Sequence, residues 1–93
     1  MNKDDYLGRV IYSKAGRDAK RFFIIVNVID DEYVQIADGD LRKVDNPKKK
    51  KIKHISILEE FSVDIMERLQ NKEYVNNSMI RKFLENRDAN KEV

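Results

Sequence analysis

Four consecutive lysines, Lys48 to Lys51, followed by Lys53 and His54, form the segment best suited to binding an anion. Ammonium groups packed this closely repel one another, so a nearby anion stabilises them. The phosphates of a nucleic acid are such anions, and neutralising them releases counterions, which makes binding weaken steeply with salt. The pattern indicates contact with a phosphate backbone. The alternative is a solvated segment that keeps a small protein soluble.

A second basic segment surrounds Gly16. Residues 9–21 contain five basic residues and one acidic residue, a local charge of +4, and residues 42–54 contain seven and one, a local charge of +6. Residues 22–41 carry five acidic residues and no basic ones, so the net charge of +2 conceals two basic segments. Arginine suits RNA because its planar guanidinium group grips phosphate and stacks on bases. The candidate RNA-binding residues are Arg9, Lys14, Arg17, Lys20, Arg21, Arg42, Lys43, Lys48, Lys49, Lys50, Lys51, Lys53 and His54.

Aromatic side chains can hold single-stranded RNA by stacking on its bases. Tyr12, Phe22, Phe23 and Tyr33 all fall in segments expected to be strands, where core positions are more usual. We therefore expect packing to be their main role, with Tyr12 and Tyr33 as the better candidates for stacking.

Other chemistry is poorly supported. The chain has no cysteine and one histidine, which excludes disulfides, a thiolate nucleophile, cysteine-type zinc sites and multi-histidine metal sites. The acidic residues at 30–32 and at 38 and 40 lack the spacing of a calcium loop, and a domain this small rarely encloses the pocket that acid–base catalysis needs. We expect these residues to form turns, and we expect no catalytic residue, metal, cofactor or small-molecule substrate.

The N-terminal segment is polar, without the apolar stretch of a secretion signal. The longest apolar run, residues 22–26, is far too short to span a membrane. With the absence of cysteine, this favours a soluble cytoplasmic protein that makes no membrane contact.

The 93 residues, 41% of them hydrophobic, suffice for one small domain. Runs of β-branched and aromatic residues predict strands over residues 7–13, 21–29, 32–38, 41–44 and 51–58. The apolar run at 21–29 predicts burial on both faces. Turns are expected at Gly16, at Asp30-Asp31 as a tight hairpin, at Asp38-Gly39, which suits two successive positive φ angles, and at Asn46-Pro47, which the four lysines follow directly. Five short strands favour a small barrel or sandwich.

The pattern changes after Phe61. Ser62 is a suitable N-cap for a short helix, and Asn76 or Asn77 for a second one. No glycine- or serine-rich linker intervenes, so residues 62–93 are expected to dock on a barrel of residues 1–61 as one domain. The expected apolar stripes are Ile65, Met66 and Leu69 in the first helix, and Met79, Ile80, Phe83 and Leu84 in the second.

A helix-turn-helix is a weaker interpretation of the same helices. Its second helix would carry Arg81, Lys82 and Arg87 into a DNA major groove, but Glu85 and Asp88 dilute this charge.

Residues 8–26, GRVIYSKAGRDAKRFFIIV, resemble the KOW motif, which consists of a strand, a glycine-containing loop and a second strand. Gly16 matches the loop glycine of the motif, and Arg17 and Lys20 match its polar loop positions. Residues 38–43 and 47–54 resemble the continuation found in KOW-type large-subunit ribosomal proteins and their small bacterial relatives. The resemblance covers residues 7–58 and implies an SH3-like barrel that binds RNA in or near the translation apparatus.

These patterns together predict a mainly β protein, an SH3-like barrel of about five strands with two short C-terminal helices. We expect it to bind RNA, ribosomal RNA in particular, without catalysis, and to offer its helices to ribosomal proteins. Two alternatives stay open. One is an SH3-like interaction module whose basic segments bind an acidic protein, and the other is a KOW module of the transcription-elongation type.

Overall fold

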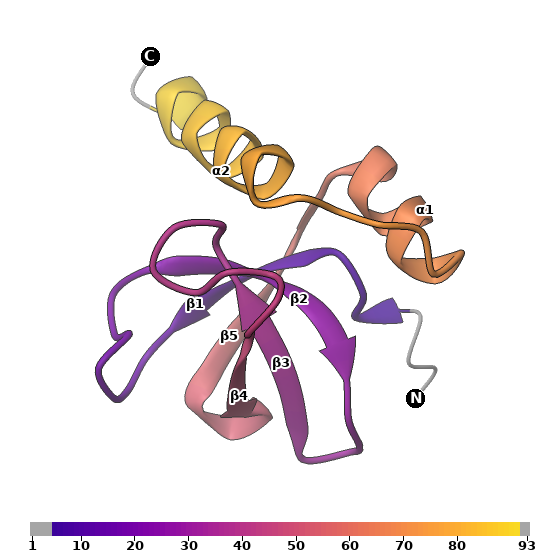
Figure 1. Cartoon of the computed structure of the whole chain (residues 1–93). Coiled ribbons are helices and arrows are strands. Elements are labelled where there is room, and N and C mark those ends of the chain that lie inside the picture. The colour runs from indigo at the N-terminus through magenta and orange to yellow at the C-terminus, as the bar shows by residue number, and fades with distance from the viewer. Residues whose placement is uncertain (1–4, 92–93) are drawn as a thin grey trace.

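The computed structural model describes residues 5–91 as five antiparallel strands and two helices (Figure 1). The strands lie in one sheet in the order β4-β3-β2-β1-β5. The prediction of a mainly β protein with two C-terminal helices is therefore confirmed. The elements are β1 (Arg9–Ser13), β2 (Phe22–Val28), β3 (Tyr33–Ala37), β4 (Lys48–Lys51), the 3₁₀ turn η2 (Ile52–His54), β5 (Ile55–Phe61), α1 (Val63–Gln70) and α2 (Asn77–Lys91).

The sheet is open but strongly curved. Strands β4 and β5 are its two edges, and no ladder joins them within residues 5–91. In a flat sheet these edges would lie about 19 Å apart. The chain nevertheless passes from Lys51 to Ile55 through η2, which spans at most about 14 Å even when fully extended. The edges must therefore approach each other at this end, and irregular pairing near Arg9–Ile11 and Ile25–Asn27 favours such bending.

Strands β1 and β2 are buried on both faces. Phe23, Ile24 and Ile25 have no exposed surface, which confirms two-sided burial in the middle of the run at 21–29, whereas Arg21 and Asn27 are exposed. Because side chains alternate along a strand, the core has two parts. One part lies on the face away from the helices and contains Ile11, Phe23, Ile25, Val28, Val34, Ile36 and Ile55. The other joins the sheet to the helices and contains Val10, Ile24, Ala37, Ile65, Val75, Ile80 and Leu84.

The helix caps follow the predicted residues. Ser62 Oγ accepts a hydrogen bond from the Ile65 amide at 3.3 Å, and Asn76 Oδ1 accepts one from the Met79 amide at 2.8 Å. Of the two candidates for the second cap, Asn76 therefore fills the role. Asn77 instead accepts a hydrogen bond from the Val44 amide at 2.8 Å and holds the preceding loop on the helix.

The strand predicted over residues 41–44 is absent, and the segment consists of bends and a turn. The chain does turn at Asp38-Gly39, but only Gly39 of the two residues has a positive φ. Asp38 Oδ1 accepts hydrogen bonds from the amides of Asp40 and Arg42, at 3.0 and 2.8 Å. The Asp38 carboxylate thus accepts the hydrogen bonds that a partner strand would otherwise accept from these amides. Residues 38–47 therefore form a loop.

Gly39 allows this loop to lie against α2. Its φ is +79°, and a Cβ placed there would lie 2.2 Å from the carbonyl oxygen of Asn77. Only glycine combines this backbone conformation with so close an approach.

The four lysines form β4, and the predicted strand over residues 51–58 is divided among the end of β4, η2 and β5. Lysine has a low β-propensity, which explains why the residue pattern gave no strand here. At the edge of a sheet, however, lysine is common because its charge prevents pairing with another chain.

Candidate nucleic-acid interface

The two basic segments meet at one end of the sheet. Lys50 Nζ donates a hydrogen bond to the carbonyl oxygen of Ala15 at 2.7 Å, and the Lys14 amide donates to the carbonyl oxygen of His54 at 3.0 Å. Gly16, with φ of +86° as expected for the loop glycine, lies against the Lys50 ammonium group. The loop that joins β1 to β2 therefore contacts β4 and η2 directly.

Alternation along β4 sends its lysines to opposite faces of the sheet. Lys50, only 9% exposed, points toward the Gly16 loop, and Lys48 shares that face. On the other face, Lys49 Nζ and Lys51 Nζ lie 4.4 and 5.7 Å from the centroid of the Tyr33 ring. The run of four is therefore not one uniform charged patch.

Several candidate cations have protein partners. Arg42 donates to both carboxylate oxygens of Asp18, at 3.0 and 3.2 Å, and Asp18 is only 1% exposed. Arg21 donates to Asp38 at 3.3 Å, and Arg9 donates to the carbonyl oxygens of Leu58 and Asp5. Arg21, Arg42 and Lys50 thus hold the loops in place, and Arg9 links β1 to β5. The role of Asp18 could not be predicted from the sequence, because it is simply the one acidic residue in a basic segment.

Apart from Lys49 and Lys51, which lie over the Tyr33 ring, the remaining candidates are exposed and make no side-chain hydrogen bond or ion pair with the described residues. They are Lys14, Arg17, Lys20, Lys43, Lys48, Lys53 and His54. Six of these lie on the Gly16 loop, β4 and η2, and one of the six, Lys20, lines the depression described below. We call the other five, namely Lys14, Arg17, Lys48, Lys53 and His54, the basic end. No carboxylate among the described side chains pairs with these groups, so they are available to an external anion.

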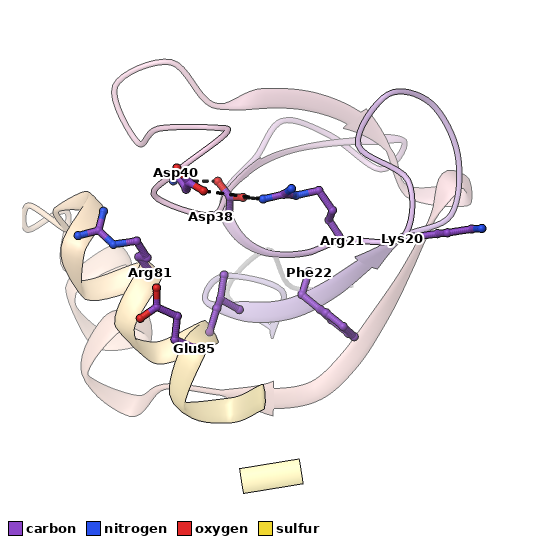
Figure 2. A pocket seen from close by; sticks show the side chains of 8 residues that line it. Lys20, Arg21, Phe22, Asp38, Asp40, Arg81 and Glu85 are labelled. Carbon is purple, nitrogen blue, oxygen red and sulfur yellow. Dashed lines mark hydrogen bonds and ion pairs between the residues drawn. The ribbon is translucent and has the colours of Figure 1, made fainter. Parts of the chain in front are cut away.

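A depression of about 390 Å³ lies between the start of β2 and α2 (Figure 2). Its walls carry both signs of charge, because Arg21 and Arg81 stand near Asp38, Asp40 and Glu85. Lys20, whose φ of +68° is unusual for a residue other than glycine, points away from these carboxylates in Figure 2. The mixed charge makes this depression a poorer phosphate site than the basic end.

Most of the candidate aromatic residues are packed. Phe23 is fully buried, and the Tyr12 and Phe22 rings contact each other with centroids 5.1 Å apart. Tyr33 is partly exposed beneath two lysines. The most exposed aromatic ring is that of Tyr74, at 67%, which belongs to no sequence motif and was not among the candidates.

Arg87, one of the three residues of the helix-turn-helix interpretation, is buried. Its guanidinium group pairs with both carboxylate oxygens of Glu60 and lies 4.2 Å from the centroid of the Phe22 ring. It joins α2 to the sheet and is not available to DNA.

Within residues 5–91, no group of three histidine, aspartate or glutamate side chains is arranged to hold a metal ion. None of the helices in this range is both long and apolar enough to cross a membrane.

No protein-family model matches this chain, and no curated protein matches it. Its function is therefore inferred from the arrangement of its own residues.

Proposed function

We propose that this protein binds RNA through the basic end, without catalysis. The observation that carries the proposal is the contact between the two basic segments, through the Lys50–Ala15 and Lys14–His54 hydrogen bonds. Five exposed groups lie on the three elements that these contacts join, and none is paired with the described residues. Phosphates spaced along an RNA backbone match such a surface better than a single small anion does.

The contacts indicate that some basic residues hold the Gly16 loop in place and that others bind phosphate. Lys50 and Arg42 fix the Gly16 loop from two sides, so the loop reaches RNA already ordered. Lys14, Arg17 and Lys48 would then bind phosphate without a large cost of ordering backbone. Recognition would rest on the shape of the RNA and the spacing of its phosphates.

We further propose that the fold is an SH3-like barrel of the KOW type and that the RNA is ribosomal and cytoplasmic. The curvature that brings β4 and β5 together at η2 supports a barrel, and the left-handed conformation of Gly16 supports the KOW resemblance. The ribosomal assignment rests on the resemblance of residues 7–58. Proteins bound to the ribosome would be partners of the helices.

The test compares two double variants with the same change in charge. Arg17→Glu with Lys48→Glu alters the basic end, and Lys72→Glu with Lys82→Glu alters exposed lysines elsewhere. We expect the first to weaken binding to cellular RNA by at least about 100-fold at 100 mM salt, and the second by less than about fivefold. Equal losses would mean that only net charge matters and would refute the assigned surface.

The outcome also separates the alternatives. If only the Lys72 and Lys82 variant loses RNA binding, the helices are favoured as the nucleic-acid surface. Binding to an acidic protein that survives RNase and depends on the basic end would favour an interaction module. RNase-sensitive co-sedimentation with ribosomal particles would support the RNA proposal.

A further inference from the structure

A second recess lies on the sheet face that carries Lys49 and Lys51. It has a volume of about 300 Å³, near the lower limit for small-ligand sites and suited to one nucleobase. Its floor includes Asn27 of β2 and Gln35 of β3, and one wall is the connection between α1 and α2, with Tyr74. The other lining residues are Val26, Val44, Asp45, Pro47, Leu69, Glu73 and Val75.

The floor offers groups that can read the edge of a base. Asn27 Nδ2 donates to Gln35 Oε1 at 2.9 Å, which leaves the Asn27 carbonyl oxygen and the Gln35 amino group without a hydrogen-bond partner among the described residues. An acceptor and a donor side by side are what amide side chains use to read base edges. Tyr74, exposed and adjacent, supplies a flat surface on which a base can stack.

The charges around the recess determine how a nucleotide would be oriented. Gln35 is the direct cross-strand partner of Lys49, so the lysines lie one strand away from the recess. Asp45 and Glu73 line the recess itself and would repel a phosphate. The phosphate would therefore lie on Lys49 and Lys51, and the base would lie in the recess.

The same carboxylates favour a base that carries an amino group. Aspartate and glutamate accept hydrogen bonds from the N4 amino group of cytosine. Uracil has the same size but presents a carbonyl oxygen at that position, which a carboxylate repels. This difference gives a matched comparison between two pyrimidines.

We propose that the recess formed by Asn27, Gln35, Glu73 and Tyr74 binds a single-stranded RNA base, with cytosine preferred over uracil. This inference rests on the proposed function, since it requires the chain to bind RNA. It adds a reading of bases to the sequence-independent phosphate contacts of the basic end.

The test measures the affinities of oligocytidylate and oligouridylate of eight nucleotides at neutral pH and fixed salt. We expect the full chain to bind the cytidine oligomer about tenfold more tightly. Tyr74→Ala should weaken that binding about fivefold or more, whereas Tyr74→Phe, which keeps the ring, should leave it unchanged. Glu73→Gln should reduce the preference for cytosine to about twofold or less. Equal affinities of the parent for both oligomers, or no effect of Tyr74→Ala, would overturn the proposal.

The same measurements distinguish a failure of base recognition in the recess from a failure of RNA binding as a whole. If both oligomers bind equally and Arg17→Glu with Lys48→Glu weakens both, RNA binding stands and the recess does not read bases. If the parent binds neither oligomer and no cellular RNA, both proposals fail. Since Tyr74 is largely exposed, its substitution should leave the unfolding transition unchanged.

Discussion

Arg42 donates two hydrogen bonds to the carboxylate of Asp18, across 24 residues of sequence, and Asp18 is almost completely buried. The pair ties the Gly16 loop to the loop of residues 38–47. A two-point contact of this kind fixes orientation as well as distance, because the planar guanidinium group and the carboxylate must be coplanar. The geometry of the basic end thus depends on a residue of opposite charge.

Replacing Asp18 by asparagine should destabilise the protein. The change leaves the Arg42 charge without its partner in a partly buried site, and we expect a loss of about 2–3 kcal/mol in the free energy of unfolding, at the lower end for broken buried pairs because Arg42 retains access to water. Urea unfolding measures the loss. A double-mutant cycle with Arg42→Leu should show coupling, and simple additivity of the two changes would contradict the pair's role.

Lys50 and Lys48 should differ in their contributions to stability, although the sequence presents them as equivalent. Lys50→Ala removes the hydrogen bond to Ala15 and the packing of a buried stem, and should cost about 1–2 kcal/mol of unfolding free energy. Lys48→Ala, at an exposed position, should change it by less than about 0.5 kcal/mol. Chemical denaturation of the two variants gives the comparison, and equal stabilities would show that the Lys50 contact contributes nothing.

The features that depend on neighbouring residues in the sequence could be predicted. Burial of residues 23–25, the cap at Ser62 and the loop conformation of Gly16 depend on residue type and short-range pattern, and all were predicted. The second cap was predicted as Asn76 or Asn77, and Asn76 fills it. Strand β4 was not predicted, because its stability comes from pairing with β3 rather than from the propensity of lysine.

In the candidate site, too, only the features that depend on local sequence could be predicted. Charge clustering identified the basic segments, but which cations are free depends on contacts between distant residues, such as Lys50 with Ala15 and Arg42 with Asp18. No local pattern contains that information. Tyr74 was missed for a related reason, since its exposure and its neighbours follow from how α1 and α2 dock on the sheet.

Gly39→Ala should be much more damaging than Gly16→Ala. Both glycines have positive φ, which costs an alanine about 1–2 kcal/mol. At Gly39 the added methyl group would also meet the backbone of Asn77, whereas at Gly16 its nearest neighbour is the movable end of Lys50. We expect Gly39→Ala to lower the melting temperature by more than about 10 °C and Gly16→Ala by about 5 °C, which calorimetry can measure. The reverse order would show that the loop does not require its close approach to α2.

RNA binding at the basic end should depend strongly on salt. Its five exposed groups could neutralise about four phosphates, so the logarithm of the association constant should fall against the logarithm of salt concentration with a slope of about −3 to −4. Arg17→Ala should make this slope shallower by about 0.9, the value for one phosphate contact, and Lys82→Ala, on α2, should leave it unchanged. Fluorescence anisotropy with a labelled RNA between 50 and 300 mM salt measures both slopes. A slope near zero for the parent would mean that phosphate contacts do not drive the association.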